Sequence, residues 1–201
     1  MAITNGYATL SEVKAYLSIS DALDDTVLEQ MTEAASRTID KIANRRFYLD
    51  TNASARLYRV TNPICLFVDD IGSTTGLVVK TDDDGDGTYE TTLTLNTDYL
   101  LDPLNANQLG RPWTQLTRLD YDEFPIPLNY RPGVQVTAKW GWPTVPDDIN
   151  QACLILVADL FKRKDAPGGI VGLAELGTIR LSPLGRDIAA MVKPYRRLVL
   201  A

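Results

Sequence analysis

The chain has 201 residues, 45% of them hydrophobic, so it can bury one sizeable core or two smaller cores. It contains no histidine, which removes the commonest general base, every histidine-based triad and most zinc catalysis. Its formal net charge of −6 argues against a protein that grips nucleic acid through its overall field, because phosphate binding needs clustered cations.

Two helices are predicted near the amino end. Thr9 and Glu12 have the spacing of a capping box, which starts a short helix with apolar groups on one side. From Asp24 to Phe47, apolar residues recur at helical spacing, with acidic residues in the first turn and Arg45 and Arg46 at the carbonyl end. We expect the rest of the chain to pack against this long amphipathic helix or to be inserted after it.

The middle of the chain is predicted to be rich in strands, because short apolar runs are separated by Asn, Pro, Gly and Asp. A segment rich in Asp and Gly, Asp82–Thr88, separates two of these runs and predicts a hairpin turn. The predicted strands are Leu57–Val60, Ile64–Val68, Leu77–Thr81, Tyr89–Leu93, Trp113–Tyr121 and Val134–Trp140.

A third helix is predicted from Pro146 to Lys164, with acidic residues in its first turn and cations in its last. Both of its sides are apolar, so each side must be buried against another part of the structure. We predict that another subunit supplies the second cover, and the β-rich region is the alternative. The predicted oligomer-interface residues are Leu154, Ile155, Ala158 and Phe161.

After this helix, residues 165–176 are predicted to be a loop and Gly177–Leu181 a short strand. A last helix is predicted to begin at Ser182 and to stop before Pro194. The tail that follows carries cations and then apolar side chains, which have no obvious place in a helical core. We predict that it is a docking segment formed by Tyr195, Arg196, Arg197, Leu198, Val199 and Leu200.

These elements predict an α+β fold, namely a small bundle of about four helices with a β-rich insertion between the second and third long helical segments. The predicted domains are a helical core of residues 1–50 and 144–201, and an insertion of residues 51–143. The start MAITNGYATL lacks a secretory signal, and no run approaches the roughly 20 apolar residues of a membrane span. We therefore expect a soluble, intracellular protein without a membrane partner.

The hairpin turn opens like a calcium loop, because Asp82, Asp84 and Asp86 alternate before a glycine. The match fails at the twelfth position, where Leu93 replaces the expected glutamate. We predict a solvated turn, no metal site and no cofactor, and keep the three aspartates as weak candidates. A calcium-dependent binding module and a carboxylate-based hydrolase remain alternatives, and a deep pocket with paired acidic residues would identify the hydrolase.

Both helical ends resemble the head-tail connector family of long-tailed phages, also called adaptor or head-completion proteins. The resemblance lies in a short helix, a long helix ending in Arg-Arg-Phe, and a third helix with a proline and acidic residues at its start. The middle resembles the larger family members, which carry a β-rich insertion with an Asp-Gly hairpin. The resembling stretches are YATLSEVKAYLSISDALDDTVLEQMTEAASRTIDKIANRRF, VPDDINQACLILVADLFKRKD and SPLGRDIAAMVKPYRRLVLA.

The resemblance implies a structural virion protein of the neck, between capsid and tail, that is assembled in the host cytoplasm and is not an enzyme. It implies a homo-oligomeric, twelvefold ring beneath the portal protein, which extends the DNA channel and offers a platform to stopper or tail-completion proteins. The apolar third helix would contact a neighbour and the tail Tyr195–Leu200 would bind the portal. The acidic net charge would let genome DNA pass without sequence-specific binding.

Overall fold

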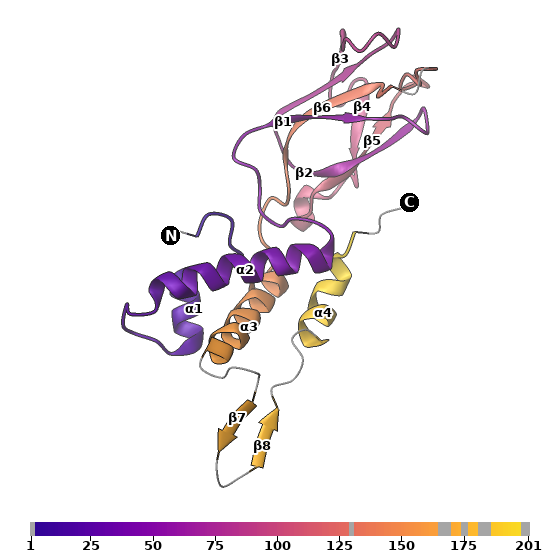
Figure 1. Cartoon of the computed structure of the whole chain (residues 1–201). Coiled ribbons are helices and arrows are strands. Elements are labelled where there is room, and N and C mark those ends of the chain that lie inside the picture. Colours follow the sequence, from indigo (N-terminus) through magenta and orange to yellow (C-terminus); the bar gives the residue numbers. More distant parts are fainter. Residues whose placement is uncertain (1–2, 129–130, 165–169, 174–176, 181–185, 198–201) are drawn as a thin grey trace. The chain divides into compact units, whose positions relative to one another are not determined.

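The computed structural model describes residues 3–128, 131–164, 170–173, 177–180 and 186–197 (Figure 1). The chain divides into two compact units, a helical unit of Met1–Phe47 with Val145–Ala201 and a β unit of Tyr48–Thr144. The predicted domains stay a prediction, because compactness does not test whether either part folds alone. None of the helices in the described ranges combines the length and the apolar character needed to cross a membrane.

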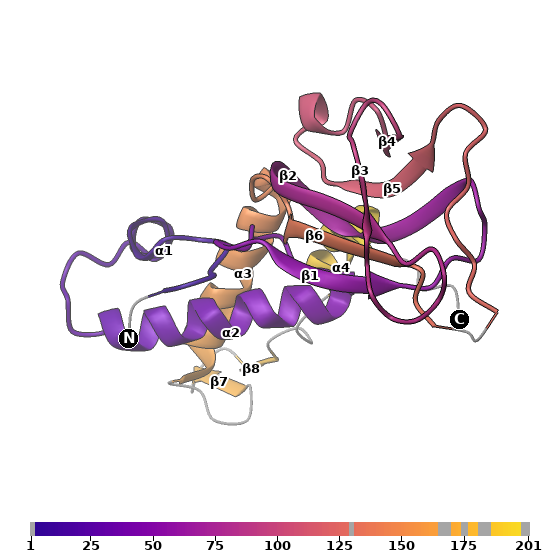
Figure 2. The same cartoon turned by 90° about the horizontal axis from the view of Figure 1, so that it is seen from above.

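The helical unit is built around α2, which packs on α1, α3, α4 and the short 3-10 helix η2. In Figures 1 and 2, α2 and α3 cross instead of running side by side. A two-stranded antiparallel hairpin, β7 with β8, belongs to the same unit. The elements are α1 (Leu10–Leu17), α2 (Asp25–Ala43), α3 (Asp147–Lys164), β7 (Ile170–Leu173), β8 (Gly177–Arg180), α4 (Arg186–Val192) and η2 (Lys193–Tyr195).

Local chemistry sets the start of α1 as predicted. The Thr9 backbone N–H donates to Glu12 Oε2 at 2.6 Å, and the Glu12 N–H donates to Thr9 Oγ1 at 3.3 Å, which completes the capping box. These bonds lower the pKa of the Glu12 carboxyl, because they favour its charged form. Helix α2 ends at Ala43, and Asn44 takes the left-handed conformation with a φ of 53°. The predicted extension of this helix to Phe47 is therefore too long.

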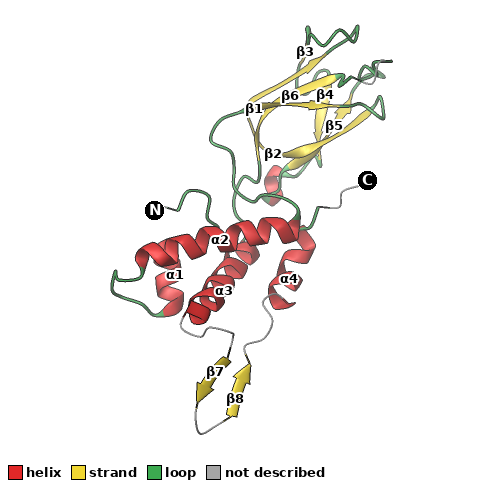
Figure 3. Ribbon diagram, in the orientation of Figure 1, coloured by secondary structure: helices red, strands yellow, loops and turns green. Residues whose placement is uncertain are grey.

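The α+β class is correct, but the predicted helical bundle is wrong. Helices α1 and α4 have only 8 and 7 residues, which is about two turns each. The two longer helices, α2 and α3, cross instead of aligning as a bundle, and the larger folded element is a six-stranded sheet (Figure 3). Helical periodicity tells which side of each helix is buried, but it does not tell what covers that side.

The β unit is a sheet in which the strands follow the order β1-β6-β2-β5-β4, with β3 also paired to β2. All of its strand pairs are antiparallel. A 3-10 turn, η1 (Asn107–Leu109), lies between β4 and β5. The strands are β1 (Ser54–Tyr58), β2 (Cys65–Thr81), β3 (Thr91–Leu93), β4 (Tyr99–Asp102), β5 (Trp113–Arg118) and β6 (Val134–Trp140).

Strand β2 runs through both parts of this sheet and organises its core. Its first half pairs with β5, where Leu66 lies opposite Leu116, and its second half pairs with β6 and β3. Register shifts between Phe67 and Val78 bend the strand between these two partners. The sequence predicts two separate strands here, because the intervening polar residues and glycines are typical of loops. The core side chains around β2 include Val68, Ile71, Leu116, Val136 and Trp140.

Other local predictions have mixed outcomes. The hairpin after β2 is confirmed, since Lys80 pairs with Thr92 across the Asp-Gly turn. Strand β4 was not predicted, and Ile170–Leu173 forms β7 where a loop was expected. The predicted start of the last helix at Ser182 lies outside the described residues.

Gly141 follows the end of β6 and has a φ of +114°. A Cβ at this position would lie 1.8 Å from the Tyr48 carbonyl oxygen, so only glycine fits.

Candidate functional site

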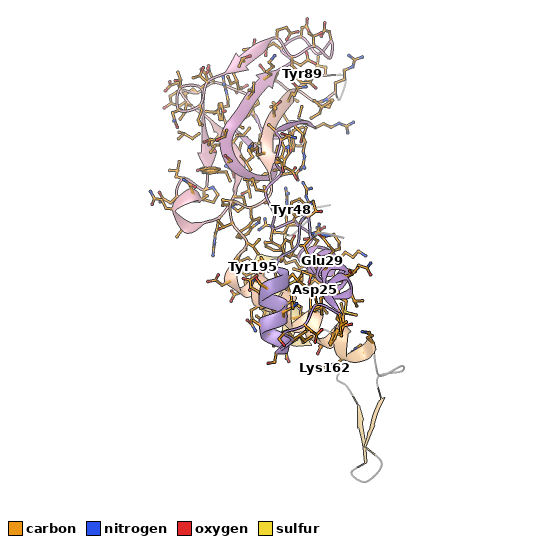
Figure 4. The ribbon with its side chains drawn as sticks, turned by 90° about the vertical axis from the view of Figure 1, so that its left-hand side faces the viewer. Asp25, Glu29, Tyr48, Tyr89, Lys162 and Tyr195 are labelled. Carbon is orange, nitrogen blue, oxygen red and sulfur yellow. The ribbon has the colours of Figure 1, made fainter. Side chains whose placement is uncertain are left out.

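The described part of the C-terminal tail lies against the carboxyl end of α2. The Tyr195 hydroxyl donates to Asp148 Oδ2 at 2.9 Å, and its ring packs edge-on against Phe47 with centroids 5.8 Å apart (Tyr195 is labelled in Figure 4). The backbone N–H of Arg197 donates to the carbonyl of Ala43 at 2.8 Å. This bond satisfies one of the carbonyls left without a helical partner at the end of α2. The start of the tail is thus held by its own chain.

The remaining predicted portal-binding residues differ in what the structure says of them. Arg196 is exposed and Arg197 is half-buried. Leu198, Val199 and Leu200 lie outside the described residues. Binding of a portal by this tail stays a prediction, and among residues 195–197 Arg196 is the one most open to a partner.

A groove opens beside this tail, between α2 and α4. It has a volume of about 300 Å³ and is lined by Ile42, Ala189, Ala190, Lys193 and Arg196. Ile42 is half-buried and the other four residues are exposed. Its floor is therefore apolar, its rim carries two cations, and these lining residues include no carboxylate. Such a surface suits an apolar side chain flanked by negative charge.

A buried polar network fixes the end of α2 from which the groove is built. The Tyr7 hydroxyl donates to Asp40 of α2 and accepts a hydrogen bond from the backbone N–H of Phe47 at 2.9 Å. Arg37 pairs with Asp40 at 2.9 Å. Burial, followed by the hydrogen bond to Asp40, raises the pKa of the Tyr7 hydroxyl above its usual range, and burial also raises the pKa of Asp40. Sequence analysis missed this network, because Tyr7 and Asp40 lie 33 residues apart and no local pattern links them.

The predicted oligomer-interface residues of α3 fall into two environments. Leu154 and Ala158 are buried within the chain, with 8% and 5% of their surface exposed. Ile155 and Phe161 are half-buried. The chain itself therefore covers part of the second apolar side of α3, which packs on α1, α2 and α4. Assembly through Ile155 and Phe161 stays a prediction.

The weak metal candidates do converge. Oxygen atoms of Asp82, Asp84, Asp86 and Glu90 lie within 4.8 Å of one another. Carboxylate oxygens are the type of ligand that Ca²⁺ takes. Asp82 is buried, and its two oxygens accept backbone N–H bonds from Gly85 at 2.7 Å and Gly87 at 2.9 Å. These bonds shape the turn, so the position of Asp82 is explained without an ion. Binding of a metal here stays untested.

No model of a protein family and no curated protein sequence matches the chain. Solved structures do match it over its whole length. A chain from the neck of an empty gene transfer agent (GTA) particle, computed with C6 symmetry, has a TM-score of 0.58 at 17% identity, covering 100% of this chain and 95% of that one. A chain from the neck of the native particle, computed with C12 symmetry, has a TM-score of 0.55 at 18% identity, covering 100% and 94%.

A third match comes from the virion of the native gene transfer agent particle. Its TM-score is 0.53 at 18% identity, and the match covers 100% of this chain and 95% of that one. At these identities the likeness establishes the fold.

Proposed function

We propose that this protein is a structural component of the neck of a phage-like particle, a head-to-tail connector of the adaptor type, without catalytic activity. The observation that carries the proposal is the fold likeness to two GTA neck chains, which covers 100% of this chain and 94% to 95% of theirs. Coverage this complete in both directions matches whole proteins, whereas a widely reused module would match only a part of each chain.

We propose that copies of the chain form a closed ring of twelve. The similar neck structures were computed with C6 and C12 symmetry, and a ring requires a contact that joins two different surfaces of the same chain. Ile155 and Phe161 supply apolar surface of α3 for such a contact, with the buried Leu154 and Ala158 beneath them. The ring surrounds the genome without reading its sequence, and the net charge of −6 limits adhesion to the phosphates.

The partners of the ring follow from its place in the particle. The exposed Arg196 and the apolar residues Leu198, Val199 and Leu200 bind the portal protein, while Tyr195 ties this segment to Asp148 of α3 and Arg197 ties it to Ala43 of α2. The opposite side of the ring receives a stopper or tail-completion protein. Assembly takes place in the host cytoplasm and the protein ends in the neck of the virion.

Electron microscopy of the purified protein, alone and mixed with its portal protein, tests this function. The expected result is a closed ring with an open centre that stacks coaxially on the portal. Tail-tube protein from the same particle serves as a control and should not stack on the ring in the absence of a stopper. A protein that stays monomeric at every concentration, with and without the portal, would overturn the proposal.

A further inference from the structure

One turn of the β unit presents an aromatic side chain to solvent among acidic residues. Tyr121 is 100% exposed, and Asp120, Asp122 and Glu123 beside it are exposed as well. The base of the turn is fixed, because Phe124 is 1% exposed and Asp122 pairs with Arg118 at 2.9 Å. The exposed ring of Tyr121 therefore projects from a turn whose base is held in place by contacts within the chain.

The backbone of this turn is strained. Asp120 and Tyr121 both take left-handed conformations, with φ values of 55° and 64°. A bulky side chain rarely adopts this region, and each such residue costs on the order of 1 kcal/mol. Among the residues that the structure describes, none packs on Tyr121 to explain the cost, because its side chain is wholly exposed. Strain that holds an exposed tyrosine outward is typical of a contact residue, and tyrosine is enriched at the centres of protein interfaces.

The groove of the helical unit complements this turn in shape and charge. Its floor of Ile42, Ala189 and Ala190 is apolar and lacks large side chains at two of its three positions, so an aromatic ring can lie flat on it. Its rim carries Lys193 and Arg196, whereas the turn carries three carboxylates. Opposite charges around an apolar centre orient two surfaces and speed their association.

We propose that the groove binds the turn Asp120–Glu123 of a second copy of this chain, with Tyr121 on the alanines and the carboxylates of Asp120 and Glu123 facing Lys193. This inference rests on the ring proposed above and names one contact of that ring. Each copy offers its turn to one neighbour and its groove to another. The contact therefore joins two different surfaces, is heterologous and repeats from copy to copy. It closes a ring when the rotation between neighbours permits.

Cysteine cross-linking between two different variants tests the contact. Both variants carry Cys65→Ser, because Cys65 is a half-buried free thiol, and Cys153 is buried. One adds Tyr121→Cys and the other adds Ala190→Cys. Under mild oxidation with copper phenanthroline, the mixture should form linked pairs and neither variant alone should do so. Leu104→Cys, at an exposed position of the same unit, replaces Tyr121→Cys in the control mixture and should give no pairs.

Charge reversal gives an independent test in the full chain. Lys193→Glu or Glu123→Lys alone should weaken self-association at least tenfold, and the two together should recover most of it. Lys162→Glu, which changes an exposed cation of the same unit outside the groove, should have little effect. If wild type forms rings but the variants neither cross-link nor show rescue, this inference is wrong and the proposed function stands. If wild type forms no rings with or without the portal, the proposed function fails separately.

Discussion

The β unit and the helical unit differ in the internal contacts that stabilise them. The β unit has an apolar core in which Val68, Ile71 and Trp140 are at most 1% exposed. In the helical unit, the first residues are tied to distant helices by polar bonds. Glu33 accepts the backbone N–H of Thr4 at 2.6 Å, and Asn150 donates to the carbonyl of Tyr7 at 2.8 Å.

This difference separates the stability of the fold from the positioning of the surfaces used in assembly. The sheet gains its stability from apolar area that its own strands bury, which is a property of the whole core. The helical unit depends in addition on single polar contacts that fix where the end of α2 lies, and that end carries the groove and the tail. A substitution in the apolar core of the sheet should therefore change stability, whereas one at the surface of the helical unit can change assembly while the fold persists. Five predictions test this contrast, beginning with the largest effect.

Trp140→Ala should destabilise the β unit by about 3–5 kcal/mol, because it leaves a cavity and also removes the bond from the indole N–H to the Ser54 carbonyl at 2.8 Å. Denaturant unfolding followed by near-ultraviolet circular dichroism measures the loss, and helix content should fall little. Leu57→Ala, at an exposed position of the same sheet, should stay within about 0.5 kcal/mol of wild type. Equal losses for both variants would contradict an apolar core centred on Trp140.

Ile155→Glu should abolish ring formation while leaving a folded monomer. The half-buried side chain would bring an unpaired charge into a contact between copies, where no partner offsets its desolvation. Analytical ultracentrifugation reports the oligomer and circular dichroism reports the fold. Gln151→Glu adds the same charge at an exposed position of α3 and should still assemble. Intact rings of the Ile155→Glu protein would remove α3 from the interface.

Deletion of residues 198–201 should weaken association with the portal by at least tenfold and leave the melting temperature unchanged, because Tyr195 and Arg197 keep their bonds to the helical unit. Arg196→Ala should mainly slow association and raise its sensitivity to salt. Surface plasmon resonance at two salt concentrations measures both effects. Normal portal binding by the truncated protein would overturn the assignment of the tail.

Tyr7→Phe should cost about 1–3 kcal/mol, since the buried N–H of Phe47 loses its acceptor and Asp40 loses a donor. Because the folded state raises the pKa of Tyr7 above its usual range, the stability tied to its protonated form is complete below about pH 10 and falls as the pH rises further. The difference between variant and wild type should therefore shrink above about pH 10. Tyr16→Phe, at an exposed position of α1, is the matched control and should be neutral.

The smallest effect is expected at the acidic hairpin. A chelator should leave the melting temperature of the β unit unchanged, because bonds from Gly85 and Gly87 already engage the buried Asp82 carboxylate. Differential scanning calorimetry with calcium and with chelator measures this. A rise of several degrees with calcium, lost in Asp84→Asn, would instead assign a metal site to the hairpin.

Local spacing along the chain predicts the features that depend on neighbours a few residues apart. The capping box of Thr9, the long helix α2, the third helix ending at Lys164 and the hairpin after β2 were all predicted, because each is written in local spacing. The α+β class followed from those elements.

How the elements combine depends on contacts between residues that lie far apart in the chain. Strand β2 runs through Gly72 and Gly76, where the local pattern indicates a loop, because β5, β6 and β3 pair with the segments on either side. The bond between Tyr7 and Asp40 and the groove between Ile42 and Ala189 join residues 33 and about 150 positions apart. The helices do not form the expected bundle. Helical periodicity identifies the buried side of a helix but not the element that packs against it, so the bundle could not be tested from sequence. Contacts of this range depend on the whole chain at once, and local spacing does not encode them.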